Sequence, residues 1–143
     1  MFVPSLKLPI LMKTMATSLF ILLFLSFLYL PSSAQSDPDP QVLVGEWQLD
    51  MSPEDPDDAN FASMLIRKVG KSTFSGYFYR PGVPIREARI RISQGRVYGA
   101  LLSGDNSGDY HSAFFFEDGR LHGTTHALER DFLAVWTAVK TDP

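Results

Sequence analysis

The sequence offers few residues for nucleophilic, acid–base or metal chemistry. It has no Cys and three histidines, His111, His122 and His126. Neither a Gly-x-Ser-x-Gly nucleophile motif nor a phosphate-binding loop occurs. On a strand, the Cα atoms of His122 and His126 would lie about 13 Å apart, too far to share one tetrahedral metal. We therefore predict no catalytic residue, no metal site and no cofactor.

An acidic stretch is the second candidate for chemistry. Residues 51–60 carry Glu54, Asp55, Asp57 and Asp58, whose carboxylates are oxygen ligands of the kind that calcium prefers. Their spacing does not match a calcium-binding EF-hand loop, which also needs a Gly at its sharp turn. The two prolines of this stretch exclude a central strand. The sequence predicts a solvated acidic loop.

The N-terminal segment has the pattern of an export signal. An uncharged apolar run at 19–30 follows Lys7 and Lys13 and is followed by small residues up to Ala34. This pattern predicts a secretory signal peptide over residues 1–34, cleaved near Ala34-Gln35. The apolar run is shorter than the roughly 20 residues of a membrane span, although an uncleaved anchor stays open. We expect an exported protein, extracellular or periplasmic, with no stable membrane span after cleavage.

The remaining chain is small and acidic. Without the leader's two lysines it holds 11 basic and 16 acidic side chains, a net charge of −5 with neutral His. This charge argues against a nucleic-acid partner. The absence of Cys excludes disulfides, so the core alone must hold the domain. We predict a flexible arm over residues 35–41 and one domain over residues 42–141.

Turn signals recur about every 10–13 residues along this domain, which is typical of an all-β sandwich or barrel. Side chains alternate between apolar and polar, as in Ala88, Ile90 and Ile92 against Glu87 and Arg89. Short connections favour antiparallel neighbours, and eight strands close readily into an up-and-down barrel. The stretch 124–135 leaves room for a helical turn. The predicted strands lie at about 42–50, 61–69, 72–80, 84–93, 96–103, 109–117, 120–126 and 131–140.

Aromatic residues on several strands occupy both faces, as in the run Phe114-Phe115-Phe116. One interpretation is ordinary core filling with a few exposed rings. The other is an aromatic-lined pocket or a partner surface. The sequence leaves open whether the barrel is hollow and which face of the strand around Tyr98 points inward.

Gly45-Glu46-Trp47 at the first strand and Lys140 at the end of the last resemble the calycin pattern of lipocalins and avidins. In those families a Gly-x-Trp motif begins the barrel, and a basic residue of the final strand packs on the Trp ring. The resemblance implies that Gly45, Trp47 and Lys140 close one end of the barrel. Lys140 matches the basic position, and Arg130 is the alternative. The segment 74–78 is also similar to a Gly-containing strand of avidins, which implies that Phe78 faces a ligand.

The resemblance implies a lipocalin-like protein that binds a small, mostly apolar ligand inside the barrel. Phe78, Tyr98, Phe114 and Trp136 are the expected pocket lining, and Tyr98 would supply a hydroxyl. One alternative is a non-catalytic protein-interaction or inhibitor module with a packed barrel. A second is a small barrel isomerase or cyclase with a His or Tyr as general acid. The sequence leaves open whether the protein forms a homo-oligomer.

Overall fold

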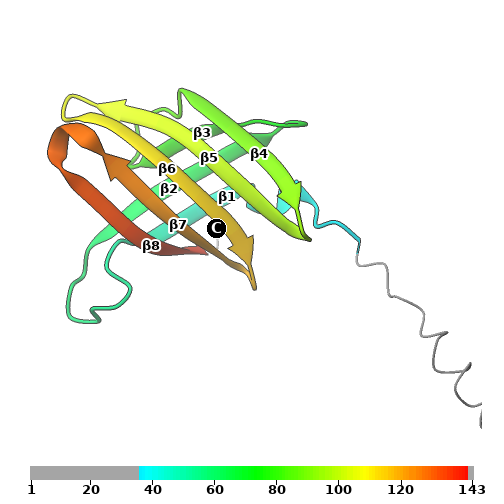
Figure 1. The fold of residues 1–143 in the computed structure, drawn as a ribbon, viewed down its shortest axis with the longest axis horizontal. Helices are drawn as coiled ribbons and strands as arrows, with labels where there is room; N and C mark the ends of the chain where they lie inside the picture. Colours follow the sequence, from blue (N-terminus) through cyan, green and yellow to red (C-terminus); the bar gives the residue numbers. More distant parts are fainter. Residues whose placement is uncertain (1–35, 142–143) are drawn as a thin grey trace, which may run out of the picture. The chain divides into compact units, whose positions relative to one another are not determined.

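The computed structural model describes residues 36–141 as an eight-stranded antiparallel sheet that curls into a nearly closed barrel. Each strand pairs with the next along the chain except β3 with β4, and the first strand also pairs with the last, which gives the order β3-β2-β1-β8-β7-β6-β5-β4. Figure 1 shows β1 to β3 passing behind β5 to β8. The predicted signal peptide and its cleavage junction lie outside the described residues.

The strands agree closely with those predicted from alternation and turn signals. Most differ from the predicted bounds by one to three residues, because side-chain alternation fixes a strand better than its ends. The strands are β1 (Gly45–Asp50), β2 (Phe61–Val69), β3 (Phe74–Tyr79), β4 (Glu87–Ser93), β5 (Arg96–Asp105), β6 (Gly108–Glu117), β7 (Arg120–Ala127) and β8 (Phe132–Lys140).

Backbone hydrogen bonds from the segments that precede β3 and β4 link these two outermost strands. The Ile85 amide donates to the Gly76 carbonyl at 3.0 Å, and the Ile90 amide donates to the Ser72 carbonyl at 2.9 Å. An isolated antiparallel bridge joins Tyr77 to Pro84. These contacts satisfy part of two sheet edges that would otherwise be open to pairing. The predicted up-and-down eight-stranded barrel is confirmed.

Turn chemistry sets the tightest hairpins. Asp118 and Gly119 connect β6 to β7 with φ values of 50° and 78°. Positive φ at both positions is what a two-residue type I′ turn requires. Gln94 and Gly95 connect β4 to β5 in the same way, with φ values of 52° and 71°. Both hairpins follow from turn signals visible in the sequence.

Two short 3-10 helices flank the strands. The first, η1 (Pro40–Leu43), is capped by Asp39, whose side chain accepts a hydrogen bond from the Gln41 amide. Because these residues turn, β1 begins at Gly45 and not at residue 42. The second, η2 (Leu128–Arg130), is the helical turn for which the stretch 124–135 left room.

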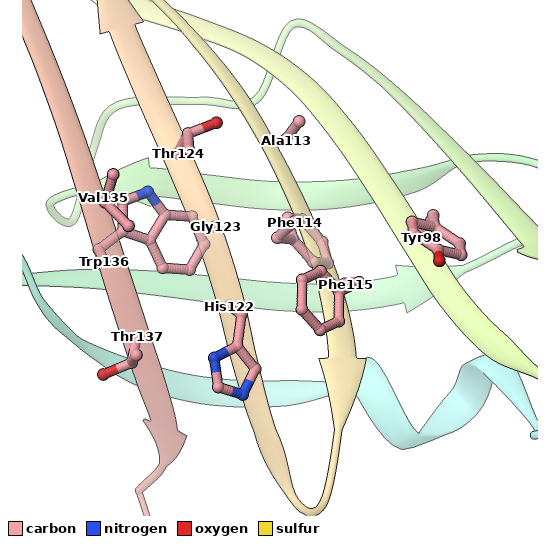
Figure 2. A pocket seen from close by; sticks show the side chains of 10 residues that line it. All are labelled: Tyr98, Ala113, Phe114, Phe115, His122, Gly123, Thr124, Val135, Trp136 and Thr137. Carbon is pink, nitrogen blue, oxygen red and sulfur yellow. The ribbon is translucent and has the colours of Figure 1, made fainter.

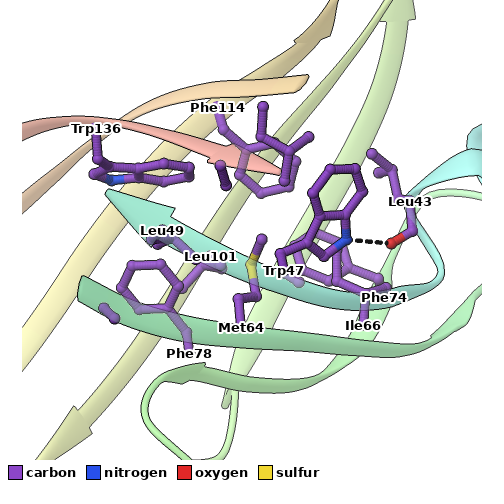
Figure 3. Close-up of a cluster of buried hydrophobic side chains, with 14 of the residues drawn as sticks. Leu43, Trp47, Leu49, Met64, Ile66, Phe74, Phe78, Leu101, Phe114 and Trp136 are labelled. Atoms are coloured by element: carbon purple, nitrogen blue, oxygen red, sulfur yellow. Dashed lines mark hydrogen bonds between the residues drawn. The ribbon is translucent and has the colours of Figure 1, made fainter. Parts of the chain in front are cut away.

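The barrel interior is packed with apolar side chains (Figure 3). Gly99, Phe114, Gly123 and Trp136 form one inward row across β5 to β8. Each ring lies over a glycine: a Cβ on Gly99 would be 2.3 Å from the Phe114 ring, and one on Gly123 would be 2.3 Å from the Trp136 ring. Small and large residues therefore alternate around the barrel, and the large ones fill it.

No helix within residues 36–141 has the length and apolar character needed to cross a membrane.

Candidate functional site

Gly45, Trp47 and Lys140 lie together at one end of the barrel. The Lys140 ammonium is 5.2 Å from the centre of the Trp47 ring and donates to the carbonyls of Val42 and Val44, at 2.8 Å each. Gly45 has a φ of 139°, and a Cβ there would be 3.2 Å from the Lys140 side chain. Trp47 is buried, and its indole NH donates to the Leu43 carbonyl at 2.9 Å (Figure 3). We call this the closed end.

Arg130, the alternative partner for the Trp47 ring, lies elsewhere. It belongs to η2, between β7 and β8, whereas Lys140 ends β8 beside Trp47. The Arg130 guanidinium is 5.8 Å from the centre of the Phe132 ring and donates to the Tyr110 hydroxyl at 3.2 Å. It therefore belongs to the opposite end of the barrel, where the β1–β2, β3–β4, β5–β6 and β7–β8 connections gather. We call that end the mouth.

Three of the four residues predicted to line a pocket meet inside the barrel. The Trp136 ring centre is 6.1 Å from that of Phe78 and 6.3 Å from that of Phe114. All three side chains are buried. These rings pack on one another, so they act as core.

Tyr98, the fourth predicted lining residue, points away from the barrel interior. It lies on β5 between the buried residues Val97 and Gly99, and its ring is 6.1 Å from that of Phe115. Both line a groove of about 330 Å³ on the outer surface of β5 to β8 (Figure 2). The structure does not bring Tyr98 together with the other three.

Hydroxyl groups occupy inward positions in the half of the barrel nearest the mouth. Ser103 and Tyr110 are partners in the row closest to the mouth, and Ser112 and Thr125 are partners in the next row. Ser112 and Thr125 are hydrogen bonded at 2.8 Å, and Thr125 accepts the indole NH of Trp136 at 2.9 Å. The interior thus changes from apolar at the closed end to polar towards the mouth.

Ser103 is the exception in this polar region. Its side chain is fully buried, and its hydroxyl has no hydrogen-bond partner among the described residues. Leaving a buried hydroxyl unpaired costs about 1–3 kcal/mol. An unpaired group of this kind is a candidate contact for a bound molecule.

A polar network surrounds the buried Tyr110 at the mouth. Its hydroxyl lies 3.1 Å from the Ser107 hydroxyl and 3.3 Å from an Asp105 carboxylate oxygen, and it accepts from Arg130. Arg80 forms an ion pair with Asp105. Together with Tyr79 and Asn106, these residues line an open pocket of about 480 Å³.

Tyr79 covers Tyr110. The two rings stack with centres 5.0 Å apart and planes inclined by 16°. Tyr79 ends β3 with a φ of 82°, an unusual backbone conformation for a residue with a side chain. Such strain costs of order 1–3 kcal/mol and persists only where the surroundings impose it. Its position at the mouth makes this ring a candidate for displacement.

Hydrogen bonds hold Asp105 in its charged form. The side chain and the backbone amide of Ser107 both donate to this carboxylate, with Arg80 and Tyr110 close by. Donors directed at the anion lower the pKa of Asp105 below its ordinary value. The Asp105 carboxylate therefore stays charged at neutral pH, and its negative charge balances the positive charge of Arg80. Arg130, in contrast, has no salt bridge within residues 36–141: it donates to the neutral Tyr110 hydroxyl and lies over the Phe132 ring.

The three histidines and the acidic loop do not form one site. His111 and His126 face each other across β6 and β7 on the outer surface, and His122 stacks on Phe115 with centres 5.1 Å apart. Asp55 and Asp58 accept hydrogen bonds within their own loop. Within residues 36–141, no group of three His, Cys, Asp or Glu side chains is placed to hold a metal ion.

The residues at the mouth could not be found from the sequence, because they lie far apart along the chain. They are located in or beside three different connections between strands. One signal was available: inward positions continue through Tyr110, Ser112 and Phe114, which places a serine in the core. Buried hydroxyls need partners, so an inward Ser or Thr marks a polar region of the interior. The contacts of Arg80 and Arg130 have no comparable signal.

No protein-family model matches the chain, and no curated protein matches it. The class is therefore defined by architecture alone: an eight-stranded, antiparallel, up-and-down, nearly closed barrel. This fold is consistent with a calycin-like barrel.

Proposed function

We propose that this protein is a non-catalytic binding barrel that takes a small ligand with an anionic head and an aromatic or apolar body at the mouth. The barrel is the rigid frame of this site. At the end opposite the mouth, the contacts of the closed end keep the barrel closed. The proposal keeps the small ligand expected from the sequence but places it at the mouth, because aromatic rings fill the middle of the barrel. Export of the protein, as the leader predicts, would let it meet such a ligand outside the cytoplasm.

The unpaired hydroxyl of Ser103 is the observation that carries this proposal. It lies in the row nearest the mouth, beside Tyr110. Ser103 is fully buried and is not among the residues that line the mouth pocket. A polar atom of a ligand would therefore pair with this hydroxyl, and recover its cost of burial, once a covering side chain moved aside.

Charge at the mouth favours one negative group. Arg80 is compensated by Asp105, whereas the contacts of Arg130 are neutral. A carboxylate or sulfonate accepts charge-assisted hydrogen bonds from a guanidinium, which are about twice as strong as neutral ones. Arg130 is therefore the residue assigned to the anionic head.

Tyr79 and Tyr110 supply the surface for the body of the ligand. A ring that replaced the Tyr79 side chain on Tyr110 would keep the stacking and release the strained backbone of Tyr79. Stacked aromatic pairs contribute about 0.5–1.5 kcal/mol beyond the area that they bury. An aromatic or flat apolar body fits this exchange.

The anionic naphthalene dye 8-anilinonaphthalene-1-sulfonate tests the proposal, because it combines a sulfonate with flat rings. We expect saturable binding of one dye per chain, followed by dye fluorescence. Arg130→Gln should weaken binding about tenfold or more, since a hydrogen bond to a charged group contributes about 1.5–3 kcal/mol. Ser103→Ala, which removes only the hydroxyl, should weaken it less.

Arg120→Gln is the matched control, because Arg120 is an exposed arginine at the other end of β7. It should leave the dye affinity unchanged. Equal losses in Arg130→Gln and Arg120→Gln would mean that the dye senses only overall charge, and the proposal would fail. Binding that ignores both Arg130→Gln and Ser103→Ala would also overturn it.

A further inference from the structure

The connection between β3 and β4 lies at the mouth and ends in a four-residue tip, residues 79–82. Its base is fixed, because the Phe78 amide donates to the Val83 carbonyl at 3.1 Å and the Val83 side chain is buried. The Val83 amide also donates to the Arg80 carbonyl, at a longer 3.3 Å. Gly82 is exposed, and a Cβ there would meet nothing within 4 Å. The tip therefore has space to move while its base stays in place.

Two consecutive side chains of the tip contact the hairpin formed by β5 and β6. The Tyr79 ring stacks on Tyr110 with centres 5.0 Å apart, and Arg80 forms an ion pair with Asp105. Tyr110 and Asp105 also contact each other, because the Tyr110 hydroxyl lies 3.3 Å from a carboxylate oxygen. These contacts join the two connections beside the mouth pocket, which all four residues line.

The Tyr79 ring occupies the surface on which the body of a ligand would stack. Tyr110 lies beside Ser103 in the inward row nearest the mouth. Tyr79 packs on the Tyr110 ring and, half-buried, against the core. One face of an aromatic ring stacks with one partner at a time. A flat ligand body on this face of Tyr110 would therefore have to take the place of Tyr79.

The backbone of Tyr79 makes this contact easy to release. Its φ of 82° is a strained conformation for a residue with a side chain, and the surroundings must maintain it. The strain is of the same order as the stacking energy of two aromatic rings. The Arg80 side chain is 59% exposed, so its ion pair adds little. Opening of the tip thus exchanges a stacked pair for a relaxed backbone, and the two states lie close in free energy.

We propose that the Tyr79 ring is autoinhibitory: in the free protein it stacks on Tyr110 and blocks the mouth until a ligand displaces it. This inference rests on the proposed function, because it concerns access to the same site. Ser103 becomes reachable when the Tyr79 ring leaves Tyr110. The affinity for a ligand is then the affinity of the open state, reduced by the fraction of molecules that are open.

Thiol labelling of a Ser103→Cys variant tests this inference without a ligand. The chain has no Cys, so position 103 carries the single thiol. The variant should fold, because the two side chains are similar in size and the Ser103 hydroxyl has no hydrogen-bond partner to lose among the described residues. The reagent is 2-sulfonatoethyl methanethiosulfonate, which is small and anionic. We expect slow labelling, measured by mass spectrometry.

Adding Tyr79→Gly to this variant should speed the labelling about threefold or more, because the open state then no longer competes with a stacked ring. Glycine adopts a φ of 82° without strain, so the tip keeps its backbone path. The change therefore removes the ring alone.

Tyr77→Gly in the same Ser103→Cys background is the matched control. Tyr77 lies two residues away on β3, and its hydroxyl contacts Glu46 on the outer surface. The control removes an equal side chain from the same strand and should leave the labelling rate unchanged. A labelling rate that Tyr79→Gly does not raise would overturn the inference. So would equal acceleration by both glycine variants, because unfolding of the whole barrel would then expose the thiol.

Dye binding by Tyr79→Gly separates this inference from the proposed function. Without the competing ring, 8-anilinonaphthalene-1-sulfonate should bind about threefold more tightly or better, and Arg130→Gln should still weaken it. Unchanged or weaker binding by Tyr79→Gly, with the Arg130→Gln effect intact, would overturn the inference and leave the proposed function standing. Faster thiol labelling, with dye binding that ignores Arg130→Gln, would support the autoinhibitory ring and contradict the proposed function.

Discussion

At the scale of single residues, the two ends of the barrel differ in how their cations are used. Lys140 at the closed end is fixed by two backbone carbonyls and the Trp47 ring. Arg130 at the mouth has neutral contacts, the Tyr110 hydroxyl and the Phe132 ring, and no salt bridge in the described part of the chain. A cation with fixed local acceptors holds the fold together, whereas a cation with neutral contacts keeps its charge available for a ligand.

Lys140→Met should destabilise the protein by about 1–2 kcal/mol. The change keeps most of the side-chain volume but removes two charge-assisted hydrogen bonds and a cation over an indole face. Urea unfolding followed by Trp fluorescence measures this loss. Lys71→Met, at an exposed turn, is the control and should change stability little. Equal stability of the two variants would contradict the role assigned to Lys140 at the closed end.

Asp105→Asn should lower the melting temperature at pH 7. The melting temperature of this variant should also fall less steeply with acidification than that of the wild type. The folded-state pKa of Asp105 is lowered, so the charged carboxylate stabilises the fold above its unfolded pKa of about 3.9. That contribution is lost as pH falls through the lowered folded value. The difference in melting temperature between the two proteins should therefore shrink as pH falls from 7 to 3. A constant difference across this range would exclude the carboxylate as the cause.

At the scale of elements, the alternation of small and large residues decides what the barrel can hold. Gly123 lies between Phe114 and Trp136 in one inward row, and its missing Cβ is the space that the indole occupies. The glycines of β5 and β7 thus allow large rings to lie flat against the sheet. Rings packed in this way fill the middle of the barrel, which is why the proposed ligand site lies at the mouth.

Gly123→Ala should destabilise the barrel by about 1–3 kcal/mol, the usual cost of overpacking. The new methyl group would be 2.3 Å from the Trp136 ring, so the indole or the strand must shift. Gly70→Ala is the control, because a Cβ there meets its nearest neighbour at an ordinary 3.6 Å. Denaturant unfolding of both variants measures the difference. If Gly123→Ala were as stable as Gly70→Ala, the interior would have room that the packing does not allow.

The strands were predictable because alternation and turn chemistry are local. Ala88 and Ile90 could be placed inside, and the Asp118-Gly119 hairpin could be recognised, without knowing the rest of the fold. Tyr98 could not be oriented, because both alternations on β5 are tolerably apolar. What decides its direction is the long-range pairing of β5 with β6, which places Gly99 under the Phe114 ring.

At the scale of the whole molecule, the candidate site could not be predicted because closing the barrel creates it. Arg80, Asp105 and Arg130 come from three connections and meet only when the strands form one barrel. The closed end could be anticipated, because Gly45-Glu46-Trp47 and Lys140 have a recognisable pattern. The division into a closed end, a filled middle and a polar mouth is therefore a property of the assembled barrel.

The proposed ligand site is the mouth. The most direct measurement maps backbone amide chemical shifts while 8-anilinonaphthalene-1-sulfonate is added to the isotopically labelled protein. We expect the largest shifts at Ser103, Tyr110 and Arg130, while Ala113 and Val135, on the outer surface of β6 and β8, change little. Shifts concentrated at Ala113 and Val135, with Ser103 and Arg130 unmoved, would contradict it.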